Sequence, residues 1–236
     1  MVIYKKKQKN VGKGYAKFSK QILIHQIPKE FEMKSNGPDD GDVWIYISET
    51  RDTKLELAHA TGKRQQEVAD ELIAKTKKRC KPPTKEKKVT FYSDGNDQYP
   101  KAILEYYDKK TINYGQIIKE REKGKVVKKT RKIIIGKMNI NDIETVNIER
   151  YNNTLRHGIS RLVRKTLCFS KCKKMLDDHL DVNQCYYNFI RAHSSLTIKT
   201  EKGEKNIKRT PCMAEGITDH IWGWNKLLWY KVGLQN

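Results

Sequence analysis

Asp94 is the first of two acidic residues whose surroundings suit metal chemistry. It ends the apolar segment "VTFYSD" (89–94), which has the pattern of a short buried strand, and Gly95 follows it. Open α/β folds place functional groups at the carboxyl ends of their strands, so Asp94 is a candidate metal-binding carboxylate. Asp-Gly is also a common turn pair. This stretch alone therefore leaves a metal ligand and a turn residue as alternatives.

Glu149 is the second candidate, and it stands at the head of a basic segment. Between Arg150 and Lys174 there are eight Lys or Arg and no Asp or Glu. In a helix, Asn153 and Arg156 share the face of Glu149. Next to that face runs an apolar stripe of Ile148, Leu155, Ile159 and Leu162.

Asp94 and Glu149 together suit Mg²⁺. This hard cation takes oxygen ligands, and one or two carboxylates plus substrate phosphates form a typical site. An acid in the first turn of a helix is also favoured by the helix dipole. The spacing of Glu149 is compatible with both roles.

A set of cysteines and a histidine also has ligand chemistry: Cys168, Cys172, His179 and Cys185. Their spacing of four, seven and six puts the first three on one face of a single helix. Structural zinc usually takes its ligands from two separate elements that close a tetrahedron. We therefore interpret these residues as small buried side chains and expect no zinc site.

The charge of the chain favours a polyanionic partner. The net charge is +21, and basic residues are concentrated in the segments 75–88, 119–137 and 150–174. Three such segments with aromatic residues nearby favour nucleic acid, with an anionic membrane as the second candidate. No apolar run approaches the roughly 20 residues that span a bilayer, and "MVIYKKKQKN" lacks the apolar region of a signal peptide. We expect a cytoplasmic protein with reduced thiols.

The elements that must position these residues follow from periodicity. Short strands are expected in "VIY" and "QILIHQI", a hairpin over 43–62, and strands at 89–94 and in "KIIIG". Helices are expected over 63–79, 99–110, 143–162 and 170–196, with a further helix start at Thr210-Pro211. This order predicts an α/β fold with a mixed sheet flanked by helices and a helical C-terminal half. It is compatible with a ribonuclease-H-like core, which periodicity alone does not single out.

Six motifs in order resemble transposases of the insertion-sequence-one type, which belong to the DDE superfamily. They are "GDVWIYI…RDTKLELAHATGKR", "YSDGNDQY", "NYGQIIK", "VNIERYNNTLRHGISRLVRKTLCFSK", "YYNFIRAHSSL" and "TPCMAEGITDHIW". The resemblance runs from Gly41 to Trp222, with a weaker similarity in "VIYKKKQKNV". The combination of "SDG", "IER.N.TLR" and "RKT..FSK" makes it specific.

The resemblance implies a ribonuclease-H-like fold and Mg²⁺-dependent DNA strand cleavage and transfer. In such enzymes three acids hold two metal ions, which activate the attacking oxygen and stabilise the leaving oxygen. Asp94 and Glu149 match the second and third acids. The family also implies a nucleoid-associated homo-oligomer that binds element ends and target DNA. The residues expected to grip the DNA backbone are Arg150, Asn153, Arg156, Arg161, Arg164, Lys165 and Lys171.

The first acid is where this sequence departs from the family. In relatives it lies in an Asp-Glu-x-Trp stretch on the first strand, just before the segment that here is "VIYKKKQKNV". Thr50 replaces a further Asp that relatives often carry, and neither Asp42 nor Asp52 stands in the expected place. The residues around "YAKFSKQILIHQIPKEFEMK" resemble an insertion.

These departures set the expected organisation and function. We expect a partial first strand plus insertion over 1–40, a catalytic core over 41–222 and a tail over 223–236. A two-metal site without one carboxylate binds its second ion poorly. The sequence thus predicts a transposase that is truncated or impaired. The alternative is a non-catalytic DNA-binding protein derived from one, acting as a regulator or an inactive subunit.

Overall fold

The protein is built around a six-stranded mixed sheet. The computed structural model describes residues 21–29, 43–123, 125–163, 172–200 and 206–230. The strands lie in the order β3-β2-β1-β4-β5-β6. Their bounds are β1 Gln21–Lys29, β2 Val43–Thr50, β3 Glu56–Gly62, β4 Val89–Asp94, β5 Ile112–Glu122 and β6 Lys125–Ile135.

The strand directions divide the sheet into three parts. β1, β2 and β3 form an antiparallel meander. β4 and β5 continue from β1 in parallel, and β6 pairs antiparallel with β5 at the outer edge. A three-stranded meander joined to parallel strands is consistent with a ribonuclease-H-like fold. The predicted α/β class, with a mixed sheet flanked by helices, is confirmed.

β1 is a central strand, bonded to β2 on one side and β4 on the other. The strand expected in "QILIHQI" is confirmed. This segment, which resembles an insertion in the sequence, thus supplies the strand next to β4. Its side chains alternate between the faces of the sheet. Ile22 and Ile24 pack in one core, whereas Leu23 and Ile27 pack in the other.

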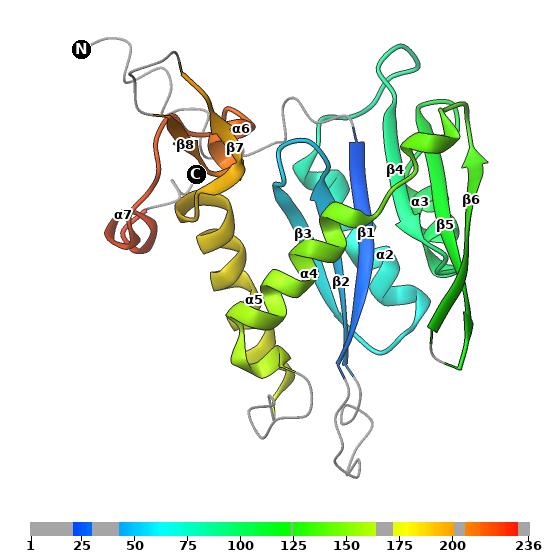
Figure 1. The fold of residues 1–236 in the computed structure, drawn as a ribbon, viewed down its shortest axis with the longest axis horizontal. Helices are drawn as coiled ribbons and strands as arrows, with labels where there is room; N and C mark the ends of the chain where they lie inside the picture. Colours follow the sequence, from blue (N-terminus) through cyan, green and yellow to red (C-terminus); the bar gives the residue numbers. More distant parts are fainter. Residues whose placement is uncertain (1–20, 30–42, 124, 164–171, 201–205, 231–236) are drawn as a thin grey trace, which may run out of the picture.

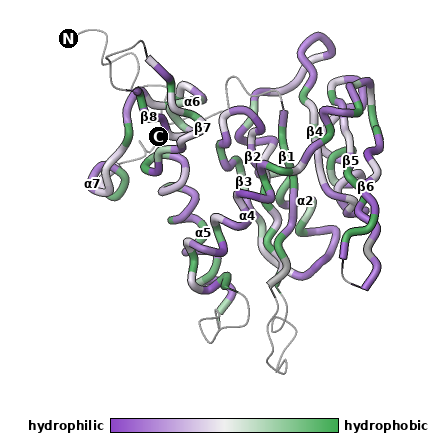
Figure 2. The backbone as a smooth tube through the Cα atoms, viewed as in Figure 1, coloured by the Kyte–Doolittle hydropathy of each residue, from purple (hydrophilic) through white to green (hydrophobic). Residues whose placement is uncertain are grey.

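Helices cover both faces of the sheet (Figure 1). α2 (Gln66–Arg79) and α3 (Gln98–Tyr106) bury their apolar residues in the first core. α4 (Val146–Gly158) crosses the other face and packs, with α5 (Lys173–Cys185), in the second core. In Figure 2 the hydrophobic colour follows the central strands. The central strands are therefore a buried middle layer between two layers of helices, whereas most of β6 is exposed.

The segment before α4 is held against the sheet by a close approach at Gly115. Gly115 lies on β5 opposite Tyr92 of β4. A Cβ atom at this position would lie 2.7 Å from Ile143 Cδ1 and 2.8 Å from Ile143 Cγ1. Ile143 is fully buried, so the absence of a side chain at position 115 lets this segment settle on β5. That contact fixes where α4 begins.

The C-terminal part differs from the prediction in two places. The helix expected over 143–162 is shorter: α4 ends at Gly158, and a separate 3-10 turn follows at Ser160–Leu162. The helix expected over 170–196 ends as α5 at Cys185 and continues as a π-helical turn over Tyr186–Ile190. "HSSL", expected in that helix, begins β7 (His193–Ile198).

Tertiary contacts explain the second difference. Asn188 donates 2.9 Å to the Glu56 carbonyl, and the Tyr187 hydroxyl donates 3.2 Å to Glu49 Oε1. These buried contacts in the π turn outweigh the helical pattern. β7 pairs antiparallel with β8 (Ile207–Arg209). α6 (Pro211–Ala214) begins after the N-cap Thr210, as predicted, and α7 (Trp224–Leu228) follows.

Within the described part of the chain, no helix is both long enough and apolar enough to cross a lipid bilayer.

Candidate active site

The candidate site lies where β1, β4 and β5 pass beneath the start of α4. Ile24 of β1 is level with Ser93 of β4, so His25 and Asp94 come next, side by side. Each lies two residues after a side chain, Leu23 or Tyr92, that packs in the core with α4, so both point toward the α4 face. His25 Nε2 lies 3.7 Å from Asp94 Oδ2. A histidine on β1 therefore faces the carboxylate at the end of β4.

The buried carboxylate of Asp94 has few interactions that offset the energetic cost of its burial. Burial raises the pKa of Asp94 above its ordinary value, although the nearby His25 and Lys119 and a backbone hydrogen bond at Asn96 partly offset it. Its Oδ1 is buried and has no hydrogen-bond partner among the described residues. An orphaned carboxylate oxygen is costly in a low-dielectric place. Its chemistry suits a cation, whereas a simple turn residue would have its oxygens bonded or solvated.

Glu149 sits in the first turn of α4 and also reaches the site. Thr145 donates a hydrogen bond of 2.8 Å to Glu149 Oε1, and Lys119 of β5 donates to the same oxygen in an ion pair. Burial alone would raise the pKa of Glu149, but the hydrogen bonds from Lys119 and Thr145 outweigh it and hold the pKa below its ordinary value. Glu149 therefore lies at both predicted positions, the start of a helix and the edge of the core.

Asn152 and His25 belong to this site, and sequence reasoning missed both. Asn152 is buried, three residues after Glu149 on α4, and its Nδ2 lies 2.9 Å from His25 Nδ1. This contact holds the imidazole so that Nε2 faces Asp94. The spacing alone could have indicated Asn152, because this residue lies four positions after Ile148, on the side of the helix that carries the apolar stripe. Nothing in the sequence distinguishes His25 until the register of β1 is known.

The described residues do not assemble the two-metal site that the resemblance implies. No group of three or more His, Cys, Asp or Glu side chains among them is arranged to hold a metal ion. Asp94 and Glu149 are carboxylates of the right chemistry. However, Lys119 already engages Glu149, and the side chain opposite Asp94 is the imidazole of His25. The donor set present is thus incomplete for two ions.

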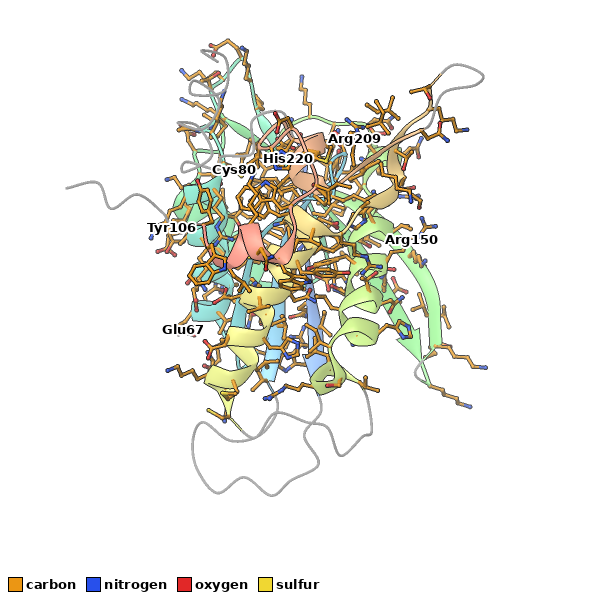
Figure 3. All side chains as sticks on the ribbon, turned by 90° about the vertical axis from the view of Figure 1, so that its left-hand side faces the viewer. Glu67, Cys80, Tyr106, Arg150, Arg209 and His220 are labelled. Atoms are coloured by element: carbon orange, nitrogen blue, oxygen red, sulfur yellow. The ribbon has the colours of Figure 1, made fainter. Side chains whose placement is uncertain are left out.

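The residues expected to grip DNA are only partly described. Arg150 and Asn153 are exposed on α4, and Arg150 is labelled beside this helix in Figure 3. Arg156 and Arg161 are half-buried, and the charge of Arg161 contributes to a lowered pKa of His179, whose main cause is burial. Arg164, Lys165 and Lys171 lie outside the described residues.

A second basic surface follows the β5–β6 ribbon. Lys119 is directly opposite Lys129, and Ile117 is opposite Arg131. Cross-strand partners share one face, so Lys129 and Arg131 lie on the same face as Lys119, which contacts Glu149. Both are exposed. Like charges directly opposite each other destabilise a sheet, and a bound polyanion would relieve that repulsion.

The remaining candidates lie apart from this site. Asp52 is exposed in the turn between β2 and β3, and Asp42 and Cys168 lie outside the described residues. Thr50 holds that turn, accepting a 2.8 Å hydrogen bond from the Leu55 amide. Cys172 is exposed and Cys185 is half-buried, and no zinc-type cluster forms among the described residues.

Comparison with known families bears on the segment that carries Glu149. The model of the family described as IS1 transposase matches residues 121–188. The resemblance to IS1 transposases is confirmed. The match covers under a third of the chain. It includes Glu149, Asn152 and all the candidate DNA-gripping residues, and it excludes Asp94 and His25.

Other comparisons add little. No curated protein sequence matches the chain. Among solved structures, the MID-PIWI domains of QDE-2 AGO from N. crassa match with 11% identity and a TM-score of 0.31. That match covers 72% of this chain and 53% of the other, so it spans about half of that protein. A likeness at this level carries no inference.

Proposed function

We propose that this chain is a transposase-type protein that acts on DNA through a DDE-type site, and that Asp94 and Glu149 are two of its three acids. The observation that carries the proposal is their placement. Asp94 ends the strand beside the central β1, and Glu149 lies in the first turn of the helix that crosses it. The charges of Lys119 and His25 act on the pKa of both acids. The family match over α4 supports the assignment of Glu149.

The reaction proposed is strand cleavage and transfer at the ends of an insertion sequence. Divalent metal supplies the activation of the attacking oxygen in such enzymes. The chain's own residues would do the rest: Asp94 and Glu149 present oxygens, Asn152 orients His25, and the basic faces of α4 and the β5–β6 ribbon hold the DNA backbone. With the imidazole of His25 opposite Asp94, we propose that the reaction is severely impaired.

The alternative, a non-catalytic DNA-binding protein, is favoured by one observation. Each proposed acid faces a side chain of the protein that can carry positive charge: Lys119 beside Glu149 and His25 beside Asp94. The Lys119 ammonium offsets part of the negative charge that the two acids would offer to divalent ions. This arrangement suits a protein that binds DNA through its basic surfaces without cleaving it.

The experiment is a paired binding and cleavage assay with the terminal DNA of the parent element in Mg²⁺. We expect salt-dependent binding and a cleavage rate no higher than that of the Asp94→Asn, Glu149→Gln double variant. Robust cleavage that is lost in the double variant would establish an intact enzyme and refute the impairment. An absence of DNA binding at low salt would refute both readings.

A further inference from the structure

The β5–β6 ribbon continues past the end of its neighbour in the sheet. The last residue pair between β4 and β5 is Asp94 with Ile117. Beyond that pair β5 runs on over residues 118–122, and among the described strands only β6 pairs with this part. We call residues 118–130 the arm. Its five residues of β5 span roughly 17 Å at about 3.4 Å per residue, so the arm reaches well past Asp94 at the outer edge of the sheet (Figure 1).

The arm is open to solvent on both faces. β6 is exposed at every position from 125 to 133, and successive side chains of a strand point to opposite faces. Neither of the two hydrophobic cores described above includes a residue of the arm. A two-stranded hairpin without a hydrophobic face to pack is marginally stable in water. Packing within the chain therefore does not explain the length of the arm, whereas a bound partner would hold it.

The composition of the arm suits a polyanion that also offers an apolar contact. Between positions 118 and 130 there are six basic and two acidic residues, a net charge of +4. Val126 and Val127, near the end of the arm, are both exposed. Contacts with phosphates alone require only cations. The major groove of DNA presents thymine methyl groups beside its hydrogen-bonding base edges, so a surface that mixes lysine with valine suits that groove.

We propose that the arm enters the major groove of duplex DNA with its α4 face toward the base edges. This inference rests on the proposed function, because it states how the DNA is held. The major groove is about 12 Å wide and about 8.5 Å deep and admits a two-stranded ribbon. The arm is long enough to cross that depth. Its α4 face carries Lys119, which contacts Glu149, so the groove that the arm enters lies beside the candidate site.

Lysines on an edge strand have a second known use, which is to block edge-to-edge pairing between molecules. That use requires charge on β6 alone. It requires neither a β5 that extends past β4 nor exposed valines near the end of the arm. The two roles also differ in what they predict, because edge protection makes DNA affinity independent of what fills the groove.

The test compares two mixed-sequence duplexes that differ only in the major groove. Both contain 5-hydroxymethylcytosine in place of cytosine, and in one of them each hydroxymethyl group carries glucose, which fills the groove and leaves the phosphates unchanged. Fluorescence anisotropy at low salt measures the affinity of the full chain for each. We expect the glucosylated duplex to bind at least about fivefold more weakly, as the loss of base-edge contacts predicts.

A shortened arm assigns that difference to the ribbon. Asn-Gly replaces residues 121–127 and closes a two-residue turn between Glu120 and Lys128, which already face each other across the ribbon. The replaced segment has three basic residues and one acidic residue, a net charge of +2. The matched control is the double variant Lys109→Gln, Lys110→Gln, which removes the same charge from exposed positions before the start of β5. We expect the shortened chain to bind the two duplexes within about twofold of each other and the control to keep the full difference.

Two results would overturn the proposal. One is an unmodified chain that binds both duplexes equally well, which would leave edge protection and general charge as the roles of the arm. The other is a shortened chain, folded by circular dichroism, that keeps the full difference, which would assign the groove contact to another element. If the shortened chain does not fold, Val126→Ser with Val127→Ser replaces it, and an unchanged difference there is equally decisive. A chain that binds neither duplex refutes the proposed DNA function itself, so the two failures are distinguishable.

Discussion

His25 Nε2 lies 3.7 Å from Asp94 Oδ2, across the junction of β1 and β4. The position of the pair is set by strand register, because β1 and β4 run parallel with Ile24 level with Ser93. Asn152 fixes the far side of the imidazole from α4. A histidine thus stands opposite the proposed acid Asp94, and the proposed impairment of cleavage depends on that one side chain.

The β5–β6 ribbon should contribute to DNA affinity mainly through one face. Lys129→Ala should weaken DNA binding several-fold and reduce the salt slope by about 0.9, as expected for one lost phosphate contact. Lys129 is exposed and shares the face of Lys119. Fluorescence anisotropy at several salt concentrations measures both quantities.

Lys128→Ala is the matched control for that variant. Lys128 lies on the opposite face of the ribbon and pairs with Glu120 at 3.4 Å. We expect its effect on affinity to be less than half that of Lys129→Ala. Equal losses from both variants would show that the ribbon contributes general charge and no oriented surface.

The close approach at Gly115 should be sensitive to a single methyl group. Gly115→Ala forces Ile143 and Met138 to move, and overpacking of this kind costs about 1–3 kcal/mol. Urea denaturation measures the loss. Gly158→Ala is the control, since a Cβ there meets no atom within 4 Å; it should leave stability unchanged or slightly raised. A Gly115→Ala chain as stable as the unmodified one would contradict the packing described for α4.

Glu49 should make stability fall as pH rises. Burial raises its pKa to about 8, from an ordinary value of 4.5, partly offset by the hydrogen bond from Tyr187. Between these values the unfolded chain has lost the proton and the folded chain keeps it. The folded state binds more protons, so the free energy of unfolding decreases across this window. One pKa unit corresponds to about 1.4 kcal/mol, so the total is a few kcal/mol.

Glu49→Gln removes this dependence. Urea denaturation at pH 5 and pH 8.5 should give similar stability for the two chains at the lower pH, and a more stable variant at the higher pH. Glu71→Gln is the control, because Glu71 is exposed and pairs with Lys75 on the surface of α2. An unchanged pH profile in Glu49→Gln would show that Glu49 ionises freely in the folded chain.

Much of the framework could be predicted from local sequence. The hairpin around "ETRDTK", the helix ending before "KPPTKEKK" and the strand ending at Asp94 all appear as expected, because turn residues and periodicity determine them locally. Glu149 likewise stands at a helix start beside an apolar stripe, as its spacing predicts. These features depend on neighbours in the chain.

The site itself depends on register and long-range contacts, which local patterns do not encode. His25 lies in the site only because β1 pairs with both β2 and β4. Asn152 contacts His25 in the site, whereas its neighbour Asn153, which is expected to grip DNA, is exposed, since a shift of one residue turns a helical side chain by about 100°. The end of α5 was missed for the same reason, because Tyr187 and Asn188 are held by Glu49 and Glu56, more than a hundred residues away.

The most direct test of the account compares strand cleavage by the unmodified chain and by Asp94→Asn, with Mg²⁺ and the terminal DNA of the parent element. We predict that the unmodified chain yields no more product than Asp94→Asn. Robust Asp94-dependent cleavage by the unmodified chain would contradict the account.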